Sequence, residues 1–166
     1  INKYLPELTK RYQIIHQTGD SRNQADLKLL KQSKSSLPKN HQHHYVAKSW
    51  LAPSEVSWLL KNANLVISRS GANTVAEILT NQTKALLIPL PISGGAEQLE
   101  NAKLLSDLGL ASTLDQDNLH HLLTYIDQLI NQPLKLNHNQ IAQLSNLHQQ
   151  APKKIVEILN SCVNHK

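Results

Sequence analysis

Methionine, cysteine and long apolar runs are missing or scarce in this chain of 166 residues. Because it contains no methionine, we expect it to be a fragment or an excised domain of a longer protein. The single cysteine, Cys162, excludes a disulfide framework within the chain and a cysteine-based zinc site, which suits a reducing cytoplasm. No apolar run approaches the roughly 20 residues that cross a bilayer, and no signal peptide opens the chain, so we expect a soluble protein.

Aromatic residues are also few, at 4% of the chain, and they are not interleaved with basic residues. Since no nucleic-acid-binding motif is present either, we do not expect nucleic acid as a partner. The net charge of +5 is uneven: ten Lys and Arg face four Asp and Glu through Lys61, and seven face eight from Asn62 onward. Either the basic first half has an ordinary solvated surface, or it attracts an anionic partner, such as phosphates or a lipid headgroup layer.

Short apolar runs alternate with segments of helical period along the chain, which predicts a parallel sheet covered by helices on both faces. The expected strands are QIIHQTG (13–19), HHYVAKSW (43–50), NLVIS (64–68), KALLIPLP (84–91) and ASTL (111–114). The expected helices lie in 5–12, 21–33, 53–63, 74–82, 92–109 and 118–132, followed by two more segments from about residue 137. This pattern indicates one Rossmann-like α/β domain over residues 1–166.

Two details of these helices can be predicted from single residues. The helix after residue 52 should start with Pro53 and be capped by Ser54. The C-terminal helices should be packing elements, because apolar residues recur at helical spacing: Ile141, Leu144 and Leu147, then Ile155, Ile158 and Leu159.

Three polar stretches lie at the ends of expected strands: HQTG (16–19), RSGANT (69–74) and PISGGAEQ (91–98). Ligands of open α/β sheets bind beyond the carboxyl ends of the strands, where helix N-termini converge. We therefore expect the three stretches to face one edge of the sheet and to form the binding site.

The RSGANT stretch has the residues of an anion site. Gly71 permits a turn with positive φ and the close approach of a ligand, while Ser70, Asn73 and Thr74 supply polar groups and free N–H donors where a helix begins. A phosphate suits this combination. Glu77 has two interpretations: it closes a capping box with Thr74 as the N-cap, or its carboxylate accepts hydrogen bonds from a vicinal diol such as a ribose.

The PISGGAEQLENA stretch repeats the arrangement with a different chemistry. Gly94 and Gly95 make a flexible turn, and Glu97, Gln98 and Asn101 fall at the start of the next helix. Gln98 and Asn101 share a face of that helix because three positions separate them. The stretch is either a mobile loop with a polar helix start or a site for a hydroxyl-rich ligand, for which a sugar is the natural candidate.

The histidines give no metal site in this sequence. The three histidines of HQHH (41–44) are too closely packed before a strand to face one ion, so we interpret them as surface residues. His16, alone after an apolar strand, is expected to be structural. We therefore predict neither a metal nor a cofactor.

Taken together, IIHQTG, RSGANTVAEI, ALLIPLP and EQLENA resemble the MurG family over residues 1 to about 120. MurG enzymes are bacterial UDP-N-acetylglucosamine transferases that make lipid II from lipid I, and the resembled region is their C-terminal, donor-binding domain of GT-B fold. The resemblance implies a hexosyltransferase of peptidoglycan and cell-wall synthesis. It also implies a peripheral location on the cytoplasmic face of the bacterial inner membrane.

Site roles follow from the same resemblance. Glu77 would bind the ribose hydroxyls of UDP, and Gln98 and Asn101 would hold the hydroxyls of N-acetylglucosamine. Glu97 stands where the family has Gln or His, so its sugar contact departs from the pattern. The loop near the phosphates and ribose would comprise Ser70, Gly71, Ala72, Asn73 and Thr74. The uracil would contact backbone groups at Leu51, with Trp50 and Ala52 as alternatives.

Parts of the family pattern are missing here. The chain lacks the first strand with its glycine-rich GGSxGA loop. It also lacks the N-terminal acceptor domain, which would bring lipid I, the membrane contact and the general base. No catalytic base is therefore assigned, and we expect the fragment alone to be inactive. Two other functions stay open: a GT-B transferase with another nucleotide sugar or acceptor, or a non-catalytic donor-domain partner.

Overall fold

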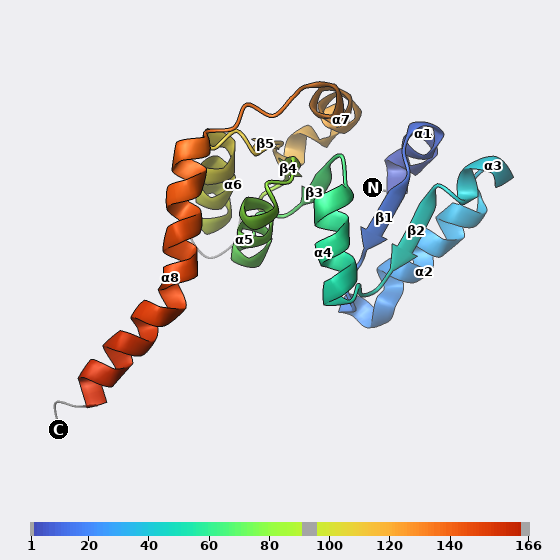
Figure 1. The fold of residues 1–166 in the computed structure, drawn as a ribbon. Helices are drawn as coiled ribbons and strands as arrows, with labels where there is room; N and C mark the ends of the chain where they lie inside the picture. The colour runs from blue at the N-terminus through green and yellow to red at the C-terminus, as the bar shows by residue number, and fades with distance from the viewer. Residues whose placement is uncertain (1, 91–95, 164–166) are drawn as a thin grey trace. The chain divides into compact units, whose positions relative to one another are not determined.

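The structure is a computed structural model that describes residues 2–90 and 96–163, and it consists of alternating helices and parallel strands (Figure 1). The chain divides into two compact units. The N-terminal unit is Ile1–Leu59 and the C-terminal unit is Leu60–Lys166. The alternation of strands and helices predicted from the sequence is confirmed.

The N-terminal unit is built on two parallel strands. Its elements are η1 (Asn2–Tyr4), α1 (Leu5–Arg11), β1 (Ile14–Gln17), α2 (Ser21–Ser35), α3 (Lys39–Gln42), β2 (Tyr45–Lys48) and the start of α4 (Pro53–Asn62). Strands β1 and β2 pair in parallel with Ile14 opposite Tyr45. Because successive side chains alternate between the two faces of a strand, Ile14 and Tyr45 point to one face of this sheet and the next pair, Ile15 and Val46, to the other.

The covered face carries the core of this unit. Tyr45 is fully buried there with three leucines from α1, α2 and the loop after α2: Leu5, Leu30 and Leu37. On the opposite face Ile15 is 48% exposed and Val46 is 41% exposed. An apolar hollow of about 410 Å³ lies beside them, bordered by Leu51 and by Trp58 of α4.

The C-terminal unit is built on three parallel strands in the order β3–β4–β5. Its elements after α4 are β3 (Val66–Ser68), α5 (Ala72–Asn81), β4 (Ala85–Leu87), α6 (Glu97–Asp107), β5 (Ala111–Thr113), η2 (Gln116–His121), α7 (Leu122–Asn131) and α8 (His138–Val163). Every residue of the central strand β4 is fully buried. A short apolar run with no polar alternation is typical of a strand that is covered on both faces.

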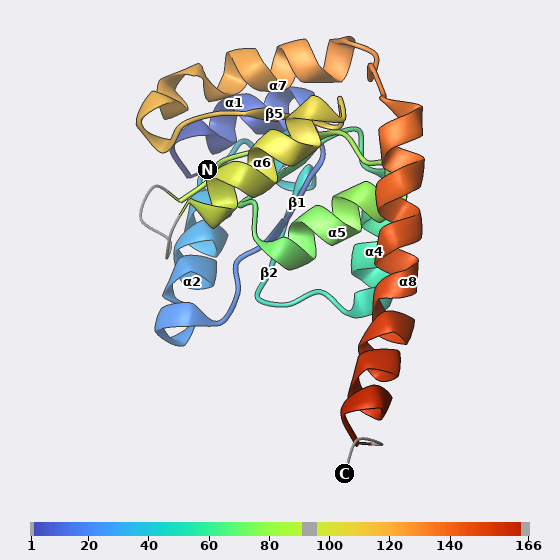
Figure 2. The same ribbon diagram turned by 90° about the vertical axis from the view of Figure 1, so that its left-hand side faces the viewer.

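Helices cover β4 from both sides (Figures 1 and 2). Ala85 and Leu87 pack in one cluster with residues of α5, α6 and α8, including Ile78, Leu105 and Ile141. Helix α7, which is not part of this cluster, also contacts β4, and its apolar residues Leu122 and Ile126 are buried. The predicted arrangement of helices on both faces is thus confirmed around this strand.

One expectation about the sheet is not met. We predicted a single parallel sheet, whereas the described strands pair in two separate groups, β1–β2 and β3–β4–β5. No hydrogen-bonded ladder among the described residues joins β2 to β3. The parallel direction within each group is as predicted.

The predicted stop of helix α6 at Gly109 is confirmed. Gly109 has a φ of +76°, and a Cβ added there would overlap the carbonyl oxygen of Lys135. The N–H of Asn137 also donates to the Leu108 carbonyl at 3.1 Å, so the segment before α8 lies directly against the end of α6. Only glycine fits this combination of backbone conformation and close approach.

Helix α8 departs from prediction in its second half. It is one continuous helix with Pro152 inside it, rather than two segments. Ile141 is buried and Leu144 packs on the same core, as predicted, but Ile155, Ile158 and Leu159 are 57–61% exposed because no described element lies against them. The side chain of Leu147 lies outside the described part. No helix within residues 2–90 and 96–163 has the length and the apolar character to span a bilayer.

Candidate functional site

The turn between β3 and α5 is the first part of the candidate site. Strand β3 ends at Ser68 and α5 begins at Ala72, with Gly71 in the N-cap position. Gly71 has a φ of −67°, so the predicted positive φ is not adopted. A Cβ added at Gly71 would meet nothing within 4 Å. This glycine therefore leaves open space at the start of the helix instead of relieving backbone strain.

Helix α5 begins two residues earlier than predicted, and this decides between the two interpretations of Glu77. With Gly71 as the N-cap, Thr74 stands at N3 and Glu77 lies in the second turn. The capping box of Thr74 and Glu77 is therefore wrong. The Glu77 side chain is exposed, and its carboxylate has no hydrogen-bond or ionic partner among the described residues.

Two hydrogen bonds tie this turn to the start of α6. Ser70 is fully buried and its hydroxyl donates to the backbone carbonyl of Gln98 at 2.6 Å. In return, Asn101 donates through Nδ2 to the backbone carbonyl of Ser70 at 3.0 Å. The structure thus brings the RSGANT and EQLENA stretches together, as expected from their places at strand ends. We call these three residues the Ser70 brace.

The start of α6 presents the remaining predicted residues. Glu97 is the first residue of the helix and is exposed. Gln98 is half-buried, and its Oε1 accepts the N–H of Leu90 at 3.0 Å. The Gln98 Nε2 and the Asn101 Oδ1 then have no partner within the described residues. Gly94 and Gly95, predicted as the flexible turn, lie outside the described residues.

Arg69 is a structural member of the site that sequence reasoning did not assign. Its Nη1 donates to the carbonyls of Ile88 at 2.8 Å and Pro89 at 3.3 Å, and its Nη2 donates to Oε1 of Gln116 at 2.8 Å. The guanidinium therefore fixes the chain after β4 to the chain after β3. Its position directly after a strand and before a glycine turn was the available signal.

In the N-terminal unit, hydrogen bonds join the ends of β1 and β2 beyond the strands. We call these residues, 17–19 and 48–52, the rim. The N–H groups of Thr18 and Gly19 donate to the carbonyls of Lys48 and Ser49, each at 2.9 Å. The N–H of Leu51, two residues beyond Ser49, donates instead to the side-chain Oε1 of Gln17 at 3.0 Å. Leu51 is therefore held by a side chain where the backbone pairing stops.

Helix α4 begins immediately after this rim, and its cap differs from prediction. The residue before the helix is Ala52, so the predicted Ser54 cap is wrong. The N–H of Ala52 donates to Oε2 of Glu55 at 2.8 Å, and Lys48 pairs with the same carboxylate. The hydrogen bond from Lys48, followed by that from Ala52, lowers the pKa of Glu55. Of the three residues considered for uracil, Ala52 thus has its N–H bound to a carboxylate.

His16 is a structural residue, as its sequence context suggested. Its Nδ1 lies 2.8 Å from the hydroxyl of the fully buried Tyr45. Burial lowers the pKa of His16 and raises the pKa of Tyr45 to about 12. Burial therefore favours the neutral form of both groups, and the tautomer of His16 decides which of them donates.

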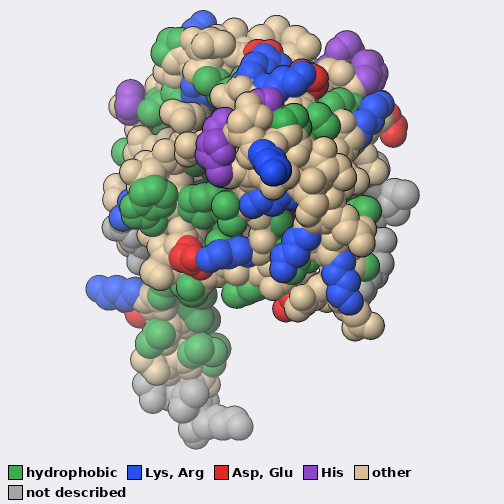
Figure 3. Space-filling model, turned by 90° about the vertical axis from the view of Figure 1, so that its right-hand side faces the viewer, with side chains coloured by type: hydrophobic (Ala, Val, Ile, Leu, Met, Phe, Trp, Pro, Cys, Tyr) green, Lys and Arg blue, Asp and Glu red, His purple; other side chains and the backbone are tan. Residues whose placement is uncertain are grey.

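The HQHH histidines contact one another or the backbone. His44 stacks on His41 with ring centroids 6.1 Å apart, and its Nδ1 lies 2.7 Å from the Thr9 carbonyl. Within residues 2–90 and 96–163, no group of three or more metal-binding side chains could hold an ion. In Figure 3 histidine and basic side chains are prominent on the surface, in keeping with the excess of Lys and Arg in the first half of the chain.

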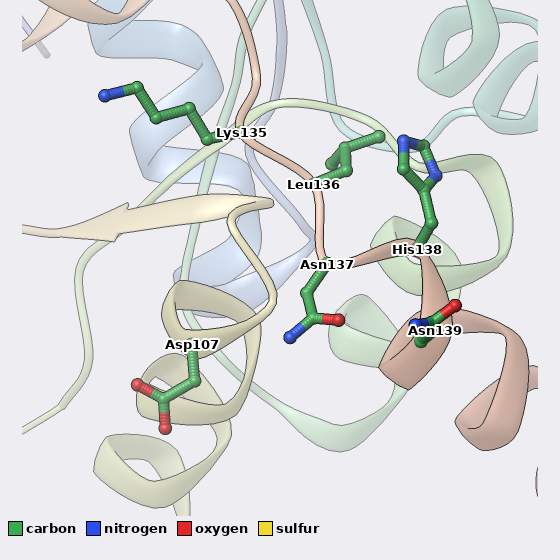
Figure 4. Close-up of a pocket in the computed structure, with 6 residues that line it drawn as sticks. All are labelled: Asp107, Lys135, Leu136, Asn137, His138 and Asn139. Atoms are coloured by element: carbon green, nitrogen blue, oxygen red, sulfur yellow. The ribbon is translucent and has the colours of Figure 1, made fainter.

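A second hollow lies away from these strand ends. It has about 580 Å³ and is lined by Asp107, Lys135, Leu136, Asn137, His138 and Asn139. Asp107 is the last residue of α6, ten residues after Glu97 and therefore about 15 Å along the helix axis. Figure 4 shows that the lining side chains do not converge on one point. This hollow is separate from the candidate site.

Comparison with known proteins gives one family over nearly the whole chain. Residues 1–158 match the model of the glycosyltransferase family 28 C-terminal domain. Curated relatives are named UDP-N-acetylglucosamine--N-acetylmuramyl-(pentapeptide) pyrophosphoryl-undecaprenol N-acetylglucosamine transferase. The protein of Gloeothece citriformis is 34% identical over 78% of this chain, and that of Natranaerobius thermophilus is 30% identical over 96%. The chain spans 32% and 43% of these relatives' lengths.

Solved structures agree with that family. The crystal structure of Acinetobacter baumannii MurG is similar with a TM-score of 0.55 and 28% identity, over 77% of this chain and 38% of that protein. A glycosyltransferase of kitacinnamycin has a TM-score of 0.59 over 90% of this chain and 34% of that protein, at 18% identity. The second similarity concerns the fold alone, and both support the predicted GT-B type of α/β fold.

Proposed function

Because the chain belongs to the glycosyltransferase family 28 C-terminal domain family, we propose that residues 1–166 are the donor-binding part of a UDP-N-acetylglucosamine transferase. The whole enzyme would transfer N-acetylglucosamine to lipid I and form lipid II, the reaction in which the curated relatives are named. The acceptor lipid and a peripheral membrane contact on the cytoplasmic side would depend on parts of the protein outside this chain.

The start of α5 is the observation that carries this proposal. The N–H groups of the first helical turn have no partner inside a helix, and Gly71 leaves them open to approach. Such a helix start stabilises a phosphate through its N–H groups and the positive end of the helix dipole. The UDP phosphates would be bound here by Gly71, Ala72, Asn73 and Thr74.

Glu77 would bind the ribose of the same nucleotide. It follows Asn73 by four residues and Thr74 by three, so it shares their face of α5, about 5–6 Å further along the axis. Side chains of a helix lean toward its N-terminus, which directs the carboxylate back toward the phosphate position. An exposed carboxylate without a protein partner can accept hydrogen bonds from both hydroxyls of a ribose.

The sugar would be bound at the start of α6, on groups that the Ser70 brace leaves unoccupied. Gln98 offers its Nε2 as a donor, whereas Asn101 offers its Oδ1 as an acceptor. Glu97 adds an exposed carboxylate that can accept but not donate. These groups suit a ligand with several hydroxyls. Ser70 itself would contribute indirectly, because its buried hydroxyl donates to Gln98 and fixes the start of α6.

The nucleobase would contact the backbone of Leu51 in the N-terminal unit. Of the alternatives, Ala52 has its N–H bound to the ion-paired Glu55, whereas the N–H of Leu51 is held only by a neutral and exposed glutamine. Replacement of Gln17 by a ligand at the Leu51 N–H therefore costs less free energy than replacement of Glu55 at the Ala52 N–H. In the transfer step, charge developing on the departing UDP would be stabilised by the α5 N-terminus.

Calorimetric titration of UDP-N-acetylglucosamine into the chain tests this function. We expect saturable binding that Glu77→Ala weakens about tenfold to a hundredfold, because a hydrogen bond to a charged group contributes roughly 1.5–3 kcal/mol. Glu157→Ala, which removes the same charge from an exposed part of α8, is the matched control and should bind like the wild type. UDP-galactose should bind more weakly, since its sugar has a hydroxyl in place of the N-acetyl group at C2 and the opposite configuration at C4.

The alternatives predict different results. Equal binding of UDP-galactose would favour a transferase with another sugar donor. Absence of UDP binding by a chain with a normal circular dichroism spectrum and cooperative unfolding would refute the donor-binding proposal and favour an interaction module.

A further inference from the structure

We infer that the Gln17 side chain occupies the base-binding position of the free protein and must move aside when a nucleotide binds. This inference rests on the proposed function, because it concerns the backbone of Leu51 as the contact for the base. The contact that points to it is the hydrogen bond from the Leu51 N–H to Oε1 of Gln17, at 3.0 Å.

The pairing of β1 with β2 explains why a side chain is needed at this point. Beyond the strands, Thr18 and Gly19 still donate to carbonyls of the β2 extension. After Gly19, which has a φ of +71°, the chain turns away into α2, so no further backbone acceptor reaches Leu51. An unpaired N–H costs free energy, and Gln17 supplies the missing acceptor.

The neighbouring contacts show why the Gln17 side chain is more easily displaced from its N–H partner than Glu55 is. The Ala52 N–H is bound to Glu55, whose carboxylate also pairs with Lys48 at 2.5 Å. By contrast, Gln17 is exposed and uncharged, and its only hydrogen bond among the described residues is the one to Leu51. Rotation of Gln17 into water would therefore uncover the Leu51 N–H without moving the rim.

The chemistry of a carboxamide identifies the class of ligand that replaces it. A glutamine side chain presents a carbonyl oxygen next to an N–H donor. Uracil presents the same pair at its C4 carbonyl and N3–H, so it can take over the contact with the Leu51 N–H. Cytosine presents an amino group and a bare ring nitrogen in those places, and its amino donor would face the N–H donor of Leu51. Displacement of Gln17 thus favours a uracil nucleotide over a cytosine nucleotide.

Titration of UDP, CDP and inorganic pyrophosphate into the wild type and Gln17→Leu tests the inference. Leucine is shorter than glutamine and cannot accept a hydrogen bond, so UDP no longer competes with the side chain for the Leu51 N–H. We expect Gln17→Leu to bind UDP about threefold to tenfold more tightly, the effect of one neutral hydrogen bond. Pyrophosphate, which has no base, should bind both proteins equally. Gln13→Leu, the same substitution at an exposed glutamine just before β1, should match the wild type.

The outcomes separate the two ideas. If the wild type binds UDP and Gln17→Leu binds it equally or more weakly, Gln17 braces the rim and the inference is overturned while the proposed function stands. If neither protein binds UDP, the proposed function fails and the inference fails with it. Binding by Gln17→Leu alone would support the inference directly.

A measurement on the wild type covers the case in which Gln17→Leu does not fold. The side-chain amide signals of Gln17, assigned in a nitrogen–proton correlation spectrum by selective labelling, should shift on addition of UDP and stay in place with pyrophosphate. Unchanged Gln17 signals at saturating UDP would overturn the inference.

Discussion

Substitution of Ser70 by alanine is the sharpest test of how the fold supports the candidate site. The change removes one buried hydroxyl, which donates to the Gln98 carbonyl at 2.6 Å, and leaves the bond from Asn101 to the Ser70 backbone intact. It therefore breaks one of the two hydrogen bonds of the Ser70 brace. Because the carbonyl of a helix residue also accepts the N–H four residues later, Gln98 keeps one partner.

The magnitude follows from those contacts. One neutral hydrogen bond contributes about 0.5–1.5 kcal/mol net, and the retained partner of Gln98 keeps the cost near the middle of that range, at about 1 kcal/mol. For a chain of this length that free energy lowers the melting temperature by about 2–4 °C. Loosening of the α6 start should also weaken the binding of UDP-N-acetylglucosamine more than that of UDP, since in the proposed site only the sugar would contact Gln98 and Asn101.

Thermal unfolding followed by circular dichroism, together with calorimetric titration, measures both effects. Ser33→Ala is the matched control, because the Ser33 hydroxyl makes an exposed hydrogen bond to the Leu29 carbonyl within its own helix. It should leave the melting temperature and both affinities unchanged. If Ser70→Ala is as stable as Ser33→Ala, or if UDP and the nucleotide sugar lose the same affinity, the Ser70 brace does not position α6 and the reasoning is refuted.

Three further predictions concern stability and pH. Gly109→Ala should lower the free energy of unfolding by more than about 2 kcal/mol, because residue 109 has a φ of +76° and its added Cβ would overlap a carbonyl oxygen. Gly71→Ala should instead fold normally and lose affinity for UDP. Urea unfolding and titration of UDP into both variants check this. Lys84→Met should lower the unfolding free energy by about 1 kcal/mol in the same assay, because its amine binds two carbonyls at the end of α7; an unchanged value would contradict that role. Burial lowers the pKa of His16 in the folded chain, so its contribution to stability is complete above the unfolded pKa of about 6.5 and declines as pH falls through the folded pKa. His16→Gln should therefore reduce the dependence of the unfolding free energy on pH between pH 7.5 and 5. An unchanged slope would exclude His16 as the source of that dependence.

Local patterns in the sequence predicted most of the secondary structure and the residues of the candidate site. The apolar run around β4 and the glycine after α6 can each be recognised within a few residues of sequence, so periodicity and turn chemistry were sufficient to predict them. The place of RSGANT and EQLENA after consecutive strands also predicted their proximity, because parallel strands end at one edge. The Ser70 brace confirms that proximity.

Tertiary structure decided what each of those side chains does. The position of Ser70 did not show that its hydroxyl is buried, and the three-residue spacing of Thr74 and Glu77 fitted a capping box equally well until the start of α5 was known. The hydrogen bond from Leu51 to Gln17 joins residues 34 apart in sequence, and Arg69 reaches Gln116 across 47. Contacts of this range depend on how strands pair and where helices begin, and no local pattern records them. The sequence by itself thus determined the fold class and the candidate residues, whereas the folded chain determined which polar groups are occupied and which remain open to a ligand.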